Sequence, residues 1–197
     1  GNRMPILQHL GDNADPDAVP RPLVVYGMRT VAHDWEKTRH QHRKTQLIFT
    51  LKGMVTCETD TGLWMVPPNC AVWIPGAMPH SARFLGDIEC YAIHVDPDRL
   101  ARPVRSCTTI SINPLARELI ARAANFAEDY SEKGPEGRVI TVLLDEIAIA
   151  PEEDLHLPMP RSPRLRQLAE IMLADPAERI SNAQWAARAG LDVHVTV

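Results

Sequence analysis

The chain has 197 residues, of which 45% are hydrophobic and 23% charged, and its formal net charge is −4. This composition fits a soluble globular protein, and the small negative charge gives no overall attraction to nucleic acid or to an anionic membrane. No apolar run approaches the roughly 20 residues of a membrane span, and four scattered cysteines without a CxxC pair favour a reducing compartment, so we expect a cytoplasmic protein with no membrane partner.

The first half of the chain predicts short strands separated by turns. After an irregular arm over residues 1–22, runs rich in β-branched and aromatic residues alternate with turn residues as far as residue 110. Several short strands with frequent turns indicate an antiparallel sandwich or barrel. The predicted strands cover residues 23–28, 45–51, 54–58, 63–66, 71–74 and 88–95.

Three histidines in this β-rich half have a spacing that can bring them together. His40, His42 and Gln46 share parity, so a regular strand projects all three to one face. His80 follows a Pro-Gly turn at Pro75, which can return the chain to the same side. Three imidazoles and a carboxamide suit a divalent transition metal (zinc, nickel, copper or iron) or a small ligand. We therefore predict these four side chains as the ligands of a metal site.

Aromatic residues offer further candidates for the same site. Trp64 and Trp73 can line a ligand pocket or pack the sheets together, and core packing is the more common role for either. His94 lies in a predicted strand, but its face depends on a register that the sequence does not give, and we leave it out of the site.

Beyond residue 110 the hydrophobic pattern becomes helical. Asn113-Pro114 supplies an N-cap and an N1 proline, and apolar residues then recur at helical spacing as far as Ala127. A Gly-Pro-Glu-Gly break at 134–137 precedes a second helix predicted over 138–150. The helical segment at 111–150 carries more apolar surface than a surface helix needs. This surface favours a homodimer interface, although the helices could simply cap the barrel.

The last part of the chain has the layout of a DNA-binding motif. Four prolines mark a stiff linker over 151–163, and an amphipathic helix follows. Ser181 can then cap an alanine-rich helix that ends at Gly190, in the order of a helix-turn-helix. The closing Val-His-Val-Thr-Val is a poor helix former. We therefore expect an incomplete helix-turn-helix domain at 164–197, with its recognition helix absent and DNA bound only through a longer form of the protein.

Two family resemblances follow from these motifs. His40-x-His42 followed by Gly53, and Pro75 followed by His80, resemble the paired motifs of the cupin β-barrels, with Gln46 in place of the cupin glutamate. Over most of residues 25–191 the chain resembles the arabinose-regulator (AraC) family of bacterial transcription regulators, in the subgroup with an N-terminal cupin sensor. The strings that carry this resemblance are Val-Pro-Pro and Val-Trp-Ile-Pro-Gly within 66–76 and Trp-Ala-Ala-Arg-Ala-Gly at 185–190.

The resemblance implies a mainly β chain with C-terminal helices (α+β). A cupin-like sensor barrel at 1–110 would be followed by a dimerisation helix pair and the partial helix-turn-helix. The implied function is a ligand- or metal-sensing and dimerisation module of an AraC-type regulator, with a small-molecule effector or metal ion as partner and no enzymatic activity. The alternative is a metal-dependent cupin enzyme acting on a small organic substrate, for which no carboxylate base stands at motif spacing.

Overall fold

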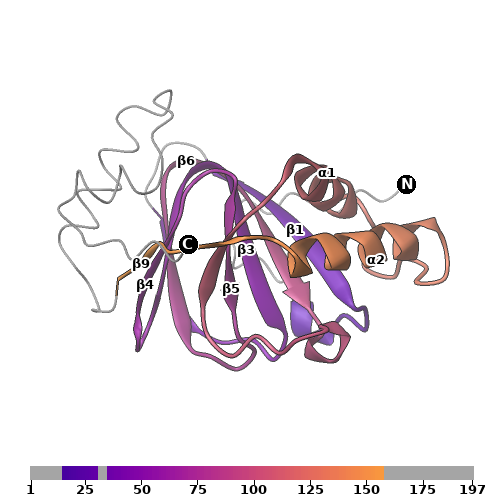
Figure 1. Ribbon diagram of the computed structural model, residues 1–197, viewed down its shortest axis with the longest axis horizontal. Helices are drawn as coiled ribbons and strands as arrows, with labels where there is room; N and C mark the ends of the chain where they lie inside the picture. Colours follow the sequence, from indigo (N-terminus) through magenta and orange to yellow (C-terminus); the bar gives the residue numbers. More distant parts are fainter. Residues whose placement is uncertain (1–14, 31–34, 158–197) are drawn as a thin grey trace.

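The computed structural model describes residues 15–30 and 35–157, and the elements named below are those within them. Nine strands form one antiparallel sheet that curls into a barrel, and two helices lie along one side of it (Figure 1). This confirms the predicted fold, mainly β with helices after the barrel. The elements are β1 (Leu23–Thr30), β2 (Trp35–His40), β3 (Thr45–Thr59), β4 (Gly62–Val66), β5 (Cys70–Ile74), β6 (His80–Val95), β7 (Thr108–Ser111), α1 (Pro114–Ala123), α2 (Pro135–Ala148), β8 (Glu152–Glu153) and β9 (His156–Leu157).

Strands β3 and β6 are the long central pair of the sheet. They run antiparallel along their whole length, from Thr45 opposite Val95 to Glu58 opposite Ser81. The register shifts twice near Gly53, which has a φ of +86°, so β3 is bulged and bent at this point. Sequence patterning predicts two strands here, because the Lys-Gly pair resembles a turn. The structure joins them into one bent strand.

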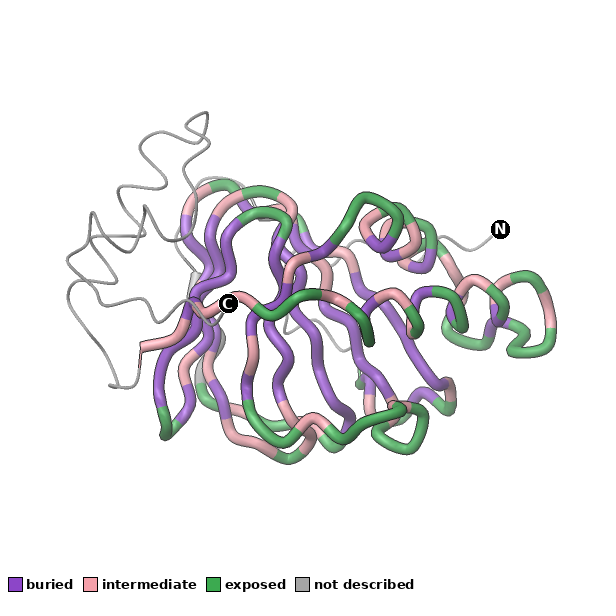
Figure 2. Tube along the Cα trace, in the orientation of Figure 1, coloured by how far each residue is buried: buried purple, intermediate pink, exposed green. Residues whose placement is uncertain are grey.

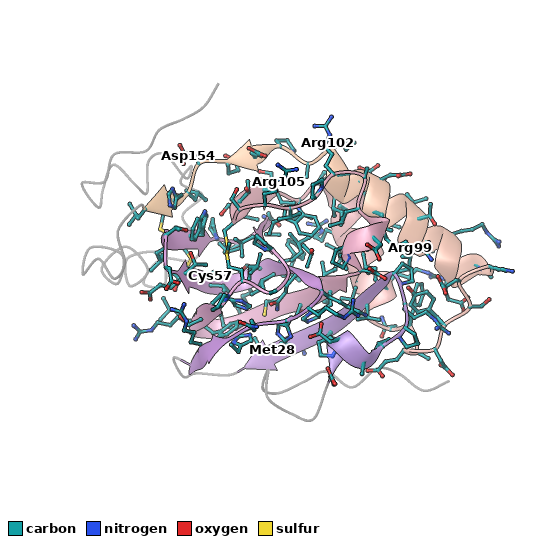
Figure 3. The ribbon with its side chains drawn as sticks, turned by 90° about the horizontal axis from the view of Figure 1, so that it is seen from below. Met28, Cys57, Arg99, Arg102, Arg105 and Asp154 are labelled. Carbon is teal, nitrogen blue, oxygen red and sulfur yellow. The ribbon has the colours of Figure 1, made fainter. Side chains whose placement is uncertain are left out.

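Alternate residues of the strands contribute to two different hydrophobic clusters. The helix-side cluster combines odd-numbered residues of β3 and β5, such as Leu47 and Trp73, with apolar residues of α1 and α2. The interior cluster takes the even-numbered residues Ile48 and Val72 of these strands, together with Met28 and Cys57, which are labelled in Figure 3. The strands are accordingly buried on both faces along most of their length (Figure 2).

The two helices begin where helix-capping chemistry places them. Asn113 Oδ1 accepts a hydrogen bond from the Ala116 N–H at 2.8 Å, and Pro114 occupies the first helical position. Helix α2 begins at Pro135, three residues before the predicted start, because a proline at the first helical position needs no hydrogen-bond acceptor for an N–H. Of these helices, none is long and apolar enough to cross a bilayer.

Residues 152–157 extend the sheet, where sequence analysis predicts the start of a proline linker. Glu152 pairs with Ile110 in β7, and Leu157 pairs with Leu63 in β4. The segment between Pro151 and Pro158 has no internal proline, so its N–H groups can join the ladder. The rest of the predicted linker, 158–163, and the predicted helix-turn-helix at 164–197 lie outside the described residues.

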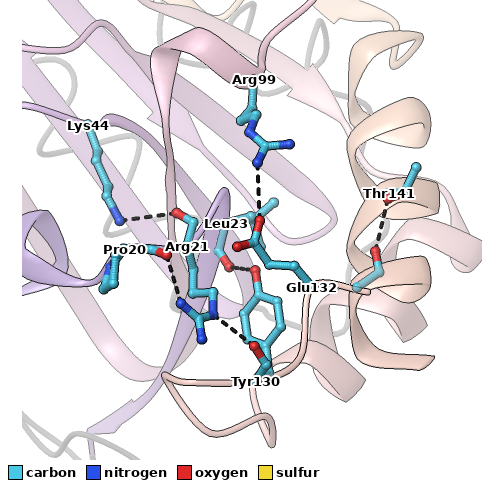
Figure 4. A network of polar contacts seen from close by, with 9 residues as sticks. Pro20, Arg21, Leu23, Lys44, Arg99, Tyr130, Glu132 and Thr141 are labelled. Atoms are coloured by element: carbon cyan, nitrogen blue, oxygen red, sulfur yellow. Dashed lines mark hydrogen bonds and ion pairs between the residues drawn. The ribbon is translucent and has the colours of Figure 1, made fainter. Parts of the chain in front are cut away.

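The described end of the N-terminal arm is held against the barrel by polar contacts (Figure 4). The Arg21 side chain donates to the carbonyl of Tyr130 at 2.8 Å, and the Tyr130 hydroxyl donates to the carbonyl of Leu23 at 2.7 Å. The buried Lys44 ammonium donates to the carbonyl of Val19 at 2.6 Å. Burial, reinforced by the nearby Arg43 charge, lowers the pKa of Lys44. The arm and the loop after α1 are thereby joined to β1.

Replacing Tyr130 with phenylalanine is expected to lower the free energy of unfolding by about 1–2 kcal/mol, because the buried Leu23 carbonyl loses its donor. Burial raises the pKa of Tyr130 to about 12. The tyrosine therefore contributes stability that is fully present below pH 10 and is lost as the pH rises toward 12. Urea unfolding at pH 8 and pH 11 should show a smaller difference between the two proteins at pH 11. An equal difference at both pH values would contradict this assignment.

Candidate metal and ligand site

Three of the predicted histidines come together in the folded chain. His40 ends β2 and pairs directly with His80, the first residue of β6, and His42 follows in the loop before β3. The ring centroids of His40 and His80 are 4.2 Å apart, and the His42 ring lies 5.0 Å from His40 and 6.0 Å from His80. One nitrogen from each ring lies within 4.8 Å of the others. The three side chains are therefore close enough to hold a metal ion.

The spacing of the histidine nitrogens can be compared with that of a zinc site. Zinc–nitrogen bonds of about 2.0–2.1 Å place the nitrogens of a tetrahedral site about 3.4 Å apart, so small side-chain movements would close this cluster on an ion. His80 Nδ1 lies 3.0 Å from the carbonyl oxygen of Met78. A donor at Nδ1 leaves the lone pair on Nε2, and such a contact orients the ring of a metal-binding histidine.

Asp17 supports the histidine loop from the N-terminal arm. Its carboxylate accepts the backbone N–H groups of Arg43 and Lys44, both at 2.9 Å, and lies 3.9 Å from His42 Nδ1. Burial acts to raise the pKa of Asp17, but these N–H groups and the His42 and Arg43 charges outweigh it and hold the pKa below its usual value. The carboxylate thereby fixes the backbone immediately after His42.

Replacing Asp17 with asparagine is expected to lower the free energy of unfolding at pH 7 by about 1 kcal/mol, a charged hydrogen-bond contribution discounted for partial solvent exposure. The lowered folded-state pKa means that this contribution is present above pH 3.8 and is lost as the pH falls through the folded value. Urea unfolding at pH 7 and pH 3 tests this, with the difference between the proteins shrinking at pH 3. A difference that persists unchanged at pH 3 would show that the carboxylate charge is not responsible.

Gln46 lies on β3 opposite His94 of β6 and Ile74 of β5. Its side chain is 3% exposed, and Gln46 Oε1 has no hydrogen-bond partner among the described residues. A buried carbonyl oxygen without a donor is costly, and a metal ion or a ligand donor would satisfy it. This observation fits the predicted role of Gln46 as a ligand.

His94 lies beside the candidate site, although sequence reasoning omits it. Its ring lies 4.9 Å from the His42 ring and 5.9 Å from Tyr26, and the residue is 3% exposed. The sequence does not give the register between β3 and β6, and this register decides which face His94 occupies. In the structure His94 pairs with Gln46, so the two side chains project from adjacent strands on the same face. No local pattern gives this register, because it joins two strands that are far apart in the sequence.

The described ring contacts of His40, His42, His80 and His94 do not include Trp64 or Trp73. Trp73 pairs with Leu47 and belongs to the helix-side cluster, on the opposite face from Gln46. Trp64 belongs to the interior cluster, where its ring stacks on His156 at 4.5 Å. The described contacts of both indoles are those of core packing.

Comparison with known proteins agrees with the barrel and its appended helices. The family model described as the AraC-like ligand binding domain matches residues 22–191. The chain belongs to this family. The HTH-type transcriptional regulator NimR of Escherichia coli K12 is 37% identical over 172 residues, which cover 87% of this chain and 63% of NimR. The AraC-like domain described here thus spans less than two thirds of the length of that relative.

The solved structure of CuxR has a similar fold at low sequence identity. The AraC-like transcriptional activator CuxR is 12% identical and has a TM-score of 0.50, over 87% of this chain and 67% of CuxR. ToxT of Vibrio cholerae is 6% identical with a TM-score of 0.46, over 87% of this chain and 72% of ToxT. The family match identifies the chain as an AraC-like ligand-binding domain, and the curated relative NimR is named as a transcriptional regulator.

Proposed function

We propose that this AraC-like domain is a metal-binding sensor and dimerisation module of a cytoplasmic transcription regulator. His40, His42 and His80 would hold a divalent transition metal, with Gln46 completing the ligand set. The observation that carries the proposal is the convergence of three imidazoles in a chain of a ligand-binding family. DNA would be bound through a longer form of the protein, a reading supported by the similarity to NimR, which is named as an HTH-type transcriptional regulator.

The neutral ligand set selects the class of metal. Imidazole nitrogens favour zinc, nickel, copper or iron over magnesium or calcium, which prefer oxygen ligands. When bound, such an ion would supply a Lewis-acidic centre at which an effector can be recognised. Two contacts of the chain would orient the ligands of this ion. The Met78 carbonyl lies against the His80 ring, and the Asp17 carboxylate accepts N–H groups of the loop that follows His42.

Metal content of the purified protein tests the proposal. Protein prepared without chelator and without a nickel column should contain about one equivalent of transition metal by elemental analysis. Reconstitution with zinc should raise the thermal midpoint above that of protein dialysed against EDTA, because an ion that binds only the folded state stabilises it. Metal far below one equivalent, with no stabilisation by added zinc, would reject the metal site.

The dimerisation part of the proposal rests on apolar side chains that the helices expose. Leu115 of α1, Val142 of α2 and Ile149 at the end of α2 are 51%, 44% and 74% exposed. Val142 and Ile149 are seven residues apart, so they share one side of the helix. Large apolar groups exposed on helices that already bury another face are typical of a second interface.

Replacing Val142 with lysine is therefore expected to convert a dimer into a monomer, because the ammonium would be desolvated in the interface. Light scattering at micromolar concentration measures the mass. Ala148→Lys is the matched control, since Ala148 is also exposed on α2 but points about 100° away from Ile149. A single-chain mass for the unmodified protein, or equal dimerisation by both variants, would exclude this helix face.

A further inference from the structure

Residues 152–157, called the strap below, join two strands of the described sheet that do not pair with each other. Within the strap, β8 pairs with β7 and β9 pairs with β4 (Figure 1). Leu155 of the strap is 3% exposed, and its carbonyl accepts the backbone N–H of Met65 at 3.0 Å. On the other side the Ser111 N–H donates to the carbonyl of Pro151 at 2.9 Å. The strap therefore bridges the gap between β4 and β7.

The docking of the strap depends on few contacts. Its two strands, β8 and β9, have only two residues each. His156 stacks on Trp64, and its Nε2 atom is buried with no hydrogen-bond partner among the described residues, which costs free energy in the docked state. Gly62 permits the close approach of β9, because an added Cβ would overlap the Leu157 carbonyl oxygen and the His156 ring. A short segment held in this way can open without unfolding of the barrel.

The strap lies on the same rows of paired residues as the start of β6. Two neighbouring rows of cross-strand partners run from β6 through β3 and β4 to β9. The first row is Ser81, Glu58, Leu63 and Leu157, and the second is Ala82, Cys57, Trp64 and His156. Ser81 directly follows His80, which pairs with His40 of β2. Continuous sheet pairing therefore connects the histidine site to the strap.

We propose that metal in the histidine site controls the docking of the strap. An ion held by His40 and His80 would fix the first residue of β6 against β2, whereas strand ends without such a restraint open readily. Fixing this end stabilises both rows and, at their far end, β9. The strap leads directly to residues 158–197, where sequence analysis predicts a linker and part of a helix-turn-helix, so its docking can carry the state of the metal site along the chain. This inference rests on the metal site proposed above.

The coupling between metal and strap has to act in both directions. If bound metal favours the docked strap by a given factor, the docked strap favours metal binding by the same factor, because the two equilibria are linked. Couplings between two sites of a protein are typically about 5–150-fold. We therefore expect an effect of at least about fivefold in each direction.

Amide hydrogen exchange in the unmodified protein, with and without saturating zinc, measures the effect of metal on the strap. The Met65 N–H is the reporter, because its acceptor, the Leu155 carbonyl, lies in the strap. The Ile112 N–H is the control, because it donates at 2.9 Å to the carbonyl of Asn69, outside the strap. Zinc should slow exchange at Met65 at least about fivefold more than at Ile112. General stabilisation by a bound ion would slow both amides alike.

The zinc affinity of strap variants measures the reverse effect. Leu155→Ala removes the buried side chain of the strap, and Gly62→Ala obstructs the approach of β9. Each should raise the dissociation constant for zinc at least about fivefold, as measured by competition with a chelator. Both variants should still bind one equivalent in excess zinc. Leu143→Ala is the matched control: it deletes a buried leucine of α2 in the helix-side cluster and should change the constant by less than about twofold.

The results separate this inference from the metal site itself. Equal slowing of exchange at both amides, or unchanged zinc affinity in both strap variants, would overturn the coupling and leave the metal site intact. An equal loss of affinity in Leu143→Ala would also overturn the coupling, because general destabilisation would then explain the result. Failure of the unmodified protein to bind zinc would reject the metal site, and the coupling with it.

Discussion

Replacing His80 with alanine is expected to reduce the zinc content of the purified protein from about one equivalent to less than one tenth. His80 is one of three imidazoles in the cluster and is buried, so alanine removes a ligand at a place where solvent cannot readily substitute for it. Loss of an orienting contact alone typically costs 10–100-fold in metal affinity, and loss of the ligand itself should cost at least about 100-fold. Elemental analysis after gel filtration in chelator-free buffer measures the effect.

A second histidine replacement controls for general effects of losing an imidazole. His156 stacks on Trp64 at 4.5 Å and lies outside the three-histidine group, so His156→Gln should retain about one equivalent of zinc. Circular dichroism should show the same strand content for both variants. Metal content that is substoichiometric in the unmodified protein and unaffected by His80→Ala would contradict the site.

Replacing Gly53 with alanine should be among the most destabilising single changes in the barrel. The residue has a φ of +86°, and an added Cβ would come within 2.6 Å of both the Asp87 carbonyl oxygen and Ile88 Cδ1. Backbone strain of this kind costs about 1–3 kcal/mol, and the displaced backbone of β6 adds to it, so we expect a loss of about 3 kcal/mol in the free energy of unfolding. Urea unfolding followed by tryptophan fluorescence measures this loss.

Gly27→Ala is the matched control for that experiment. Gly27 also lies in a strand, but an added Cβ would meet only the Tyr91 ring, at 3.5 Å and 3.8 Å, which is ordinary van der Waals contact. Its replacement should change stability by less than about 1 kcal/mol, in either direction. Similar losses for the two variants would show that the bend at Gly53 is not a special requirement of this fold.

Strand parity predicts much of the site, because the side-chain period of two is a local property. His40, His42 and Gln46 follow from parity alone, and the Pro-Gly turn before His80 indicates that the chain reverses there. What joins these pieces is long-range register. The pairing of His40 with His80 spans forty residues, and the histidine spacing alone suggests it only through resemblance to the cupin motifs.

Features that depend on tertiary context are the ones that sequence reasoning misses. His94 lies beside the site because Gln46 is its cross-strand partner, which no local pattern encodes. Residues 152–157 join the sheet because β4 and β7 offer them unpaired edges, whereas their own sequence resembles a linker. Trp73 faces the helices because the helix pair returns over that side of the barrel, although its indole could equally have served a pocket.

A single strand delivers two of the clustered imidazoles, since β6 begins at His80 and carries His94 fourteen residues later. A straight strand would hold them about 46 Å apart, yet both rings lie within about 6 Å of the ring of His42. The two rings can therefore approach His42 only after the β3–β6 pair has closed during folding. The contacts of the site thus join residues that are far apart in the sequence, which is what a high contact order means. An ion held there would resist opening of the entire barrel: at a free concentration one hundred times its dissociation constant, the added stability is about 2.7 kcal/mol. Slower exchange of amide hydrogens should then extend far from the histidines, along both long strands.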